Sequence, residues 1–371
     1  MNATRIVTIA RLELLQRVRT ASWYILLGVF AVLLLGVTAL AFLSYGGIGA
    51  GTGEASGAGI YSIVVYFTLL LVLLVSPTLS GNSINGDRDA ATLAPVQVTL
   101  ATTGDILMGK FLAAWITGLA FTAVAAPFLV IATFAGGVQP LTVIVSLLVL
   151  ILETAIVAAI GVALSGILAR PLFSVATTYL VVAALAAGTV IGFGLVGTAF
   201  SSTAVSHNRS PVYDMQGNPV CQDGVSDCAT DPAKMLCGEW ESYEYRVPRF
   251  DYVWWMLSAN PFVVLADATP TTFDAYGNPQ DAFGWLTYSI RGAQLPPELE
   301  QRWDGCAAEN FKGSVWDDAD RETPQEVMAR TLPSWFVGLT VQVLLAALLM
   351  WRAFVRTGTP ARRLPPGTRI A

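Results

Sequence analysis

The chain has 371 residues, of which 54% are hydrophobic and only 13% are charged, and its formal net charge is −5. This composition excludes an ordinary water-soluble domain, because lipid rather than water must surround most of the apolar surface. The acidic balance also gives no reason to expect a nucleic-acid partner.

Six hydrophobic stretches are each long enough to cross a bilayer, since a hydrocarbon core of about 30 Å needs roughly 20 apolar residues in a helix. A transmembrane β-barrel would alternate apolar and polar positions in segments of about 10 residues, and the stretches show no such alternation. Only helices then satisfy the backbone within lipid. The sequence therefore predicts an all-α polytopic membrane protein. The predicted spans are residues 22–44, 60–80, 111–135, 141–168, 172–199 and 333–352.

The first 21 residues predict a helix that precedes the first span. Within residues 4–19, apolar residues such as Ile6 and Leu14 alternate at helical spacing with arginines such as Arg5 and Arg17. A secretion signal fits less well, because the apolar run that follows is too long and lacks a convincing cleavage site. We expect residues 1–21 to form an amphipathic helix along the cytoplasmic membrane surface.

Basic residues fall on one side of the predicted membrane. If the N-terminus is cytoplasmic, the cytoplasmic segments hold 12 Lys/Arg and 4 Asp/Glu, whereas the segment 201–331 holds 9 Lys/Arg and 20 Asp/Glu. The positive-inside rule therefore predicts a multi-pass protein of the cell membrane with both termini in the cytoplasm. The predicted divisions of the chain are residues 1–21, spans one to five in 22–200, the segment 201–331, span six in 332–352 and a basic tail in 353–371.

The polar segment 201–331 contains all four cysteines of the chain. Disulfides persist outside the cytoplasm, so we expect an extracytoplasmic domain with two structural disulfides, whose pairing the sequence does not decide. A metal site is the poorer alternative, because no Cys-x-x-Cys spacing is present and the only histidine, His207, lies well before the cysteines. The cysteines are Cys221, Cys228, Cys237 and Cys306.

The same segment contains one apolar run, from Asp251 to Asp267, that is too short to cross the membrane and is interrupted by Asn260-Pro261. Trp254 and Trp255 suit a membrane interface, so the run predicts a re-entrant or membrane-lying pair of helices. No internal sequence repeat is evident in the chain.

The connection between the second and third spans, residues 81–110, combines charged residues with a helix start. Asp87, Arg88 and Asp89 are adjacent, and Thr102 followed by Asp105 fits a capping box that opens the third span. An ordinary solvated loop is one interpretation. A short helix that docks on a partner is the other.

This pattern resembles the permease subunits of ATP-binding cassette (ABC) transporters of the type 2 exporter class. Such permeases carry a surface helix with Arg and Glu, a charged pair before Gly-Thr-Leu in the second connection, and Gly-Lys at the start of the third span. This sequence has Ala91 where the family usually has glycine, and aspartates where glutamates are common. The matching residues are Arg11, Glu13, Asp87, Arg88, Asp89, Thr92, Leu93, Gly109 and Lys110.

The resemblance implies that residues 81–110 form the coupling element that docks on a cytoplasmic ATPase. It also implies that two permease chains, identical or related, pair above two ATPase subunits. ATP and magnesium would then be bound by those partners, and this chain would need no cofactor of its own.

The chain is not expected to be an enzyme. Gly104 to Lys110 satisfies most of the phosphate-loop pattern, but Phe111 replaces the hydroxyl that would bind magnesium, and no strand precedes the segment. A single histidine outside the spans gives no hydrolytic triad. ATP-driven transport would therefore need a separate ATPase subunit.

Glu153 is the one carboxylate near the middle of a predicted span. Placing it there costs at least ~2.5 kcal/mol on insertion scales, so its side chain should face a partner or water. It either lines a pathway or takes up a proton, or else it makes a structural hydrogen bond to a neighbouring helix, for example to a Ser or Thr of the fifth span.

Three functions follow from these patterns. The first is a permease that moves a hydrophobic or amphiphilic substrate outward, such as a lipid, drug, peptide or glycan precursor. The second is a membrane-anchored extracytoplasmic binding or sensory protein, and the third is a secondary transporter coupled through Glu153. We prefer the first, because only it explains the charged connection and the surface helix together.

Overall fold

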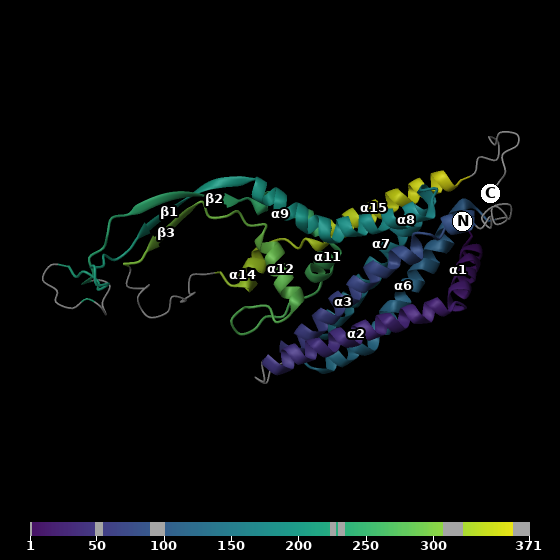
Figure 1. Cartoon of the computed structure of the whole chain (residues 1–371), viewed down its shortest axis with the longest axis horizontal. Helices are drawn as coiled ribbons and strands as arrows, with labels where there is room; N and C mark the ends of the chain where they lie inside the picture. Colours follow the sequence, from purple (N-terminus) through teal and green to yellow (C-terminus); the bar gives the residue numbers. More distant parts are fainter. Residues whose placement is uncertain are drawn as a thin grey trace.

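The computed structural model describes residues 2–48, 55–89, 101–222, 228, 234–306 and 322–358 (Figure 1). The chain is mostly helical, at 70%. Its elements in chain order are α1 (Ala3–Val18), α2 (Ala21–Ile48), α3 (Ala55–Ser80), α4 (Asn85–Asp89), α6 (Thr103–Phe134), α7 (Pro140–Ile167), α8 (Pro171–Ala183), a π-helical turn (Ala184–Gly188), α9 (Thr189–Ala199), β1 (Ser201–Arg209), β2 (Glu241–Pro248), a 3-10 turn (Phe250–Tyr252), α10 (Trp255–Ser258), α11 (Pro261–Ala268), α12 (Ala282–Gly292), β3 (Glu300–Asp304), α14 (Pro324–Arg330) and α15 (Trp335–Thr357).

Six helical segments of the described chain are long and apolar enough to cross a membrane, which confirms the six predicted spans. The chain is therefore a multi-pass membrane protein. The six segments are Ala21–Tyr45, Gly57–Asp89, Thr103–Phe134, Pro140–Ile167, Pro171–Ala199 and Trp335–Thr357.

The third span begins at Thr103 rather than at residue 111, roughly two helical turns earlier than predicted. The predicted capping box explains this start. The Thr102 hydroxyl accepts a hydrogen bond from the Asp105 amide, and the Asp105 carboxylate accepts one from the Thr102 amide. Capping satisfies two amides that the first helical turn leaves free, so the helix can begin in polar sequence before the apolar run.

The segment between the fifth and sixth spans is not all-α, and that part of the prediction was wrong. It contains a three-stranded sheet in the order β2-β1-β3, in which β1 pairs antiparallel with β2 and parallel with β3. Ala204 lies opposite Tyr245, and Val205 lies opposite Glu300. The strands continue from α9 and project away from the helices as a long ribbon (Figure 1). The helical prediction failed here because the segment is polar and its outer strands β2 and β3 are largely exposed, so its apolar pattern is weak.

Two disulfides are present, as predicted, and they use all four cysteines. Cys221 pairs with Cys228 within the connection between β1 and β2. Cys237 pairs with Cys306 and so fastens the start of β2 to the end of β3. Because the second bridge closes a long loop around a sheet with few buried side chains, it restricts the unfolded chain where packing contributes little.

One short motif occurs twice, contrary to the expectation of no internal repeat. Tyr213 to Pro219 and Phe273 to Pro279 share the pattern aromatic-Asp-x-x-Gly-Asn-Pro and form the same turn. In each, the Asp carboxylate accepts hydrogen bonds from the amides two and four residues later, at 2.8–2.9 Å. The glycines have φ angles of +84° and +78°, which explains why both turns have glycine there. So short a match escapes a search for domain-sized repeats.

The two short helices predicted around Asn260-Pro261 are present as α10 and α11. The side-chain oxygen Oδ1 of Asn260 caps α11 by accepting from the Phe262 amide, while its side-chain nitrogen Nδ2 donates to Ala186 O at 2.6 Å and to Thr189 Oγ1 at 2.9 Å. Those acceptors belong to the π-helical turn and the start of α9, so this one side chain joins the helix pair to the fifth span.

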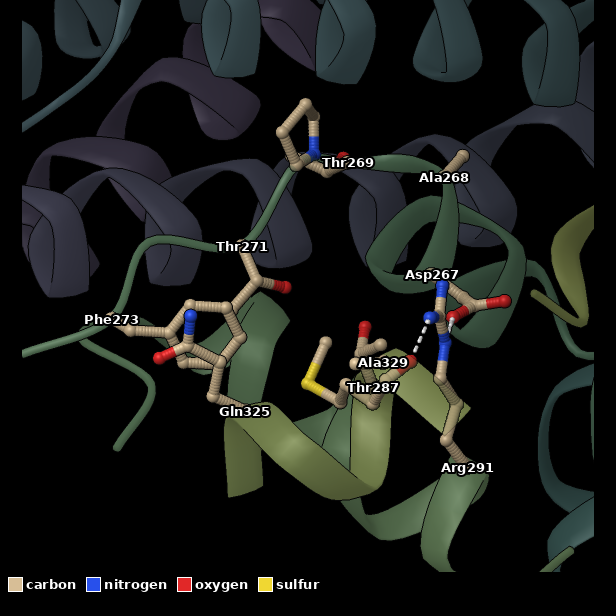
Figure 2. A pocket seen from close by; sticks show the side chains of 11 residues that line it. Asp267, Ala268, Thr269, Thr271, Phe273, Thr287, Arg291, Gln325 and Ala329 are labelled. Atoms are coloured by element: carbon tan, nitrogen blue, oxygen red, sulfur yellow. Dashed lines mark hydrogen bonds and ion pairs between the residues drawn. The ribbon is translucent and has the colours of Figure 1, made fainter. Parts of the chain in front are cut away.

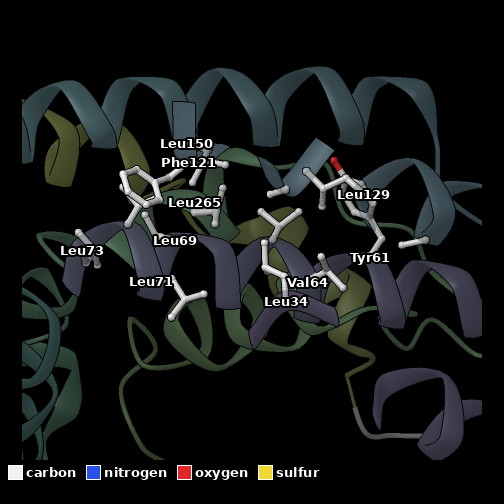
Figure 3. Packing of buried hydrophobic residues seen from close by; sticks show 14 of the residues in the cluster. Leu34, Tyr61, Val64, Leu69, Leu71, Leu73, Phe121, Leu129, Leu150 and Leu265 are labelled. Atoms are coloured by element: carbon white, nitrogen blue, oxygen red, sulfur yellow. The ribbon is translucent and has the colours of Figure 1, made fainter. Parts of the chain in front are cut away.

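The main core lies among α2, α3, α6 and α7 and includes side chains from α11 and α12 (Figure 3). Leu265 of α11 and Phe283 of α12 have no exposed surface and pack in the same cluster as Leu69 and Phe121. Helices between the fifth and sixth spans are therefore built onto the bundle. Within lipid such close packing, rather than removal of apolar surface from water, holds helices together.

Candidate functional site

The end of the molecule that carries α1, called the α1 end below, lies opposite the sheet (Figure 1). There α1 crosses α6 in direct contact at Gly109. A Cβ atom at residue 109 would lie 2.8 Å from Cβ of Ile9 and 3.1 Å from the carbonyl oxygen of Ile6. Only glycine permits this approach, which gives a physical reason for the Gly-Lys pair that the sequence pattern singled out.

Lys110 is the centre of a charge cluster that joins three elements. Its ammonium pairs with Glu13 of α1 and lies 2.6 Å from Oδ2 of Asp87 in α4. It also donates to the carbonyl oxygen of Ser83 at 2.8 Å. The Lys110 side chain is 3% exposed, whereas those of Glu13 and Asp87 are 18% and 33% exposed. Three acceptors around one buried ammonium use all three of its donors, so the charge is buried only because it is fully paired. We call Glu13, Asp87 and Lys110 the lysine cluster.

Arg88 turns the other way and binds the end of α7. Its guanidinium donates to Gly166 O at 3.2 Å, to Leu168 O at 3.4 Å and to Asn85 Oδ1 at 3.1 Å. These carbonyls lie at the C-terminal end of α7, where orphan acceptors and the helix dipole favour a cation. Asp87 and Arg88, which are adjacent in sequence, thus fasten α4 to α6 and to α7, respectively.

The described part of the second connection is not an ordinary solvated loop. Asn85 has no exposed surface, and the amides of Ile84 and Asn85 donate to Oγ of Ser165 in α7 at 2.9 and 3.1 Å. The backbone of residues 84–88 is therefore packed onto the bundle.

Two predicted site residues, Arg11 and Asp89, lie outside the lysine cluster. Both residues are exposed, and neither side chain has an ion pair or hydrogen bond within the described part of the chain. Thr92 and Leu93 lie outside the described residues.

Two further side chains hold α1 in place, and the sequence reasoning missed their roles. Arg17 donates to Thr117 Oγ1 at 3.0 Å and to Leu79 O at 2.9 Å, which ties α1 to α6 and α3. Burial lowers the pKa of the Arg17 guanidinium, and the charge of Glu13 acts in the opposite direction. Asp105, already the cap of α6, also accepts from the Asn2 amide at 2.9 Å. The spacing of α1 could not single out Arg17, because four arginines in residues 5–19 share the same type of position.

A second buried ion pair lies at the sheet end of the bundle. Arg291 of α12 donates to Oδ1 of Asp267 in α11 at 2.7 Å, and the Asp267 side chain has no exposed surface. The other Asp267 oxygen accepts from the Ser334 amide and, at 2.9 Å, from the Trp335 amide. Asp267 therefore caps α15 as well, with the carboxylate at the positive end of the helix dipole. No sequence signal connects residues that are 67 positions apart.

A cavity of about 460 Å³ lies beside this pair (Figure 2). Asp267 and Arg291 line one side of it, and Phe273 and Gln325 line another. The hydroxyl of Thr287, a residue only 1% exposed, has no hydrogen-bond partner within the described chain. The cavity thus offers polar groups and one aromatic ring, which are the ingredients of a small-molecule site.

Glu153 lies in α7 and is 1% exposed. Neither carboxyl oxygen has a hydrogen-bond partner among the described residues, so the structure does not place it in the expected hydrogen bond to the fifth span. Gln342 of α15, in the sixth span, is the polar side chain whose electrostatic effect reaches the Glu153 carboxyl group.

Neither the family models nor the curated proteins with which the chain was compared give a match.

Proposed function

We propose that this chain is the transmembrane permease subunit of an ATP-driven ABC exporter and works with a separate ATPase. The observation that supports it most is the lysine cluster. Residues singled out by the motif in three separate segments, namely Glu13, Asp87 and Lys110, meet at one buried ammonium.

The cluster provides a mechanical link between the surface helix and the second connection. A force on the chain just after α4 would act on Asp87 and, through Lys110, on α6 and on Glu13 of α1. Arg88 would carry the same force to the end of α7. In this proposal a pair of ATPase subunits docks at the α1 end, and closing them changes the packing of the spans.

The proposed orientation places the α1 end in the cytoplasm and the sheet outside. The disulfides lie in the projecting sheet segment, and disulfides persist in oxidising compartments. The basic helix α1 lies at the opposite end, as the positive-inside rule requires of a cytoplasmic segment. A second permease chain, identical or related, would complete the pathway for a hydrophobic or amphiphilic substrate moved outward.

The test is to purify the tagged chain from its native host in mild detergent and identify the proteins that accompany it by mass spectrometry. We expect a stoichiometric ATPase, ATP hydrolysis by the preparation, and weaker association in the Asp87→Ala/Asp89→Ala variant. A clean preparation with no ATPase and no hydrolysis would refute the proposal.

The cavity beside Asp267 and Arg291 favours a second candidate function, a membrane-anchored extracytoplasmic binding or sensory protein. In that case the spans are a scaffold, and charge changes at Asp87 and Asp89 leave function intact. Loss of function on filling the cavity with Thr287→Phe, together with full function in the Asp87→Ala/Asp89→Ala variant, would favour the binding protein.

A further inference from the structure

Glu153 differs from every other buried charged side chain discussed above, because it has no partner. Its residue is 1% exposed, and both of its carboxyl oxygens lack a hydrogen-bond donor among the described residues. A buried carboxylate without donors is strongly disfavoured. Such an unsatisfied group in a well-packed region needs a physical explanation.

The neighbouring side chain has an acceptor in the same condition. Gln342 of α15 is fully buried, and its amide nitrogen donates to the carbonyl oxygen of Ala259 at 3.0 Å. Its oxygen, Oε1, has no donor within the described chain. Glu153 and Gln342 therefore present three buried acceptor oxygens that receive no hydrogen bond within the described chain.

Among the described residues, no charged group is placed to balance a negative charge at Glu153. The helices packed against α7 are α3, α6, α8, α11 and α15. Their described charged residues lie near helix ends, and none of them contributes to the electrostatics of Glu153. Those residues are Asp105 and Lys110 in α6, Asp267 in α11, and Arg352 and Arg356 in α15.

A proton on Glu153 would supply the missing hydrogen-bond donor and remove the unbalanced charge, because a neutral carboxylic acid is itself a donor and carries no charge. We propose that Glu153 is a proton-binding site between the fourth and sixth spans, held in this conformation as a carboxylic acid that donates to Oε1 of Gln342. Loss of that proton would leave an unpaired charge in the contact between α7 and α15. Deprotonation is then linked to separation of these two helices, which would admit water or a cation. The inference concerns the bundle itself and does not depend on the ATPase.

Infrared spectroscopy of the purified chain at neutral pH tests this directly, since protonated carboxylic acids have a carbonyl stretch separate from that of carboxylates. We expect this band in the wild-type chain, its loss in Glu153→Gln, and its retention in Asp281→Asn, a control at another buried acid. Gln342→Leu should keep the band but shift it, because the acceptor of the proton is removed. A band that is absent from the wild type, or that is unchanged in Glu153→Gln, would overturn the proposal.

A thermal measurement separates a proton from a bound cation. Glu153→Gln is an isostere of the neutral acid, so its melting temperature in detergent should match that of the wild type. Sodium, potassium or calcium should leave the wild-type melting temperature unchanged. A cation that stabilises the wild type but not Glu153→Gln would show that the site holds an ionised carboxylate and a metal ion instead.

Discussion

Each end of the helical bundle buries an ion pair, but the two pairs hold different parts of the molecule together. At the sheet end, Asp267 and Arg291 form a one-to-one pair whose carboxylate also caps α15. At the α1 end, one lysine is shared by two carboxylates that remain partly exposed. The first arrangement fixes α11, α12 and the start of α15 to one another. The second joins a surface helix and a short connection to the bundle, as a link that transmits movement would need.

The largest expected effect is on stability at the sheet end. Asp267→Ala leaves the Arg291 charge buried without a partner and removes the cap of α15, and breaking a buried pair typically costs about 3–5 kcal/mol. We expect a strongly lowered melting temperature in detergent. The double variant Asp267→Leu/Arg291→Met removes both charges and should lose less. A double variant no more stable than Asp267→Ala would contradict a paired role.

A pH dependence of stability should also arise near this end. Burial raises the pKa of Asp281 to about 6, an effect partly opposed by the hydrogen bond from the Gly284 amide. Because the folded chain binds this proton more tightly than the unfolded chain, the added stability is complete below pH ~4 and is lost as the pH rises through about 6. The loss is about 3 kcal/mol at most.

Asp281→Asn should therefore flatten the dependence of melting temperature on pH between about 4 and 7, while keeping a side chain that can cap α12. An unchanged pH profile in this variant would place the titrating group elsewhere.

At the α1 end, Lys110→Met leaves two carboxylates facing each other without their cation. Since both are partly exposed, we expect a smaller loss of roughly 1–3 kcal/mol and easier proteolysis of α1. Lys110→Arg keeps the charge and serves as the control. Equal proteolysis in the wild type and Lys110→Met would show that the cluster does not hold α1.

A still more local change tests the close contact between α1 and α6. Gly109→Ala places a methyl group within 2.8 Å of Ile9 and should cost about 1–2 kcal/mol through overpacking. Gly28→Ala is the matched control, because no atom from another part of the described chain lies within 4 Å of its added methyl group. If both variants have the same melting temperature, α1 does not pack on α6 as described.

The two ends also show what the sequence can and cannot predict. The six spans follow from long apolar runs, and the capping box at Thr102 and Asp105 could be read from adjacent residues. The partners of Lys110 were named one by one as motif residues, but their meeting depends on the packing of α1 across α6.

Asp267 and Arg291 gave no signal, because the contact joins elements distant in the chain and neither residue belongs to a motif. The sheet was missed for a related reason. Its strands are polar on most faces, and their pairing joins residues 201–209 to residues 300–304 across a long connection.

The central claim is that the lysine cluster couples this chain to an ATPase, and its most direct test compares two neighbouring aspartates. Asp87 lies in the cluster, whereas Asp89 is exposed and outside it. ATP hydrolysis should be measured in the purified assembly of the wild type, Asp87→Asn and Asp89→Asn. The account predicts a several-fold loss in Asp87→Asn and a much smaller one in Asp89→Asn. Hydrolysis that is unchanged in Asp87→Asn, or reduced equally in both variants, would contradict it.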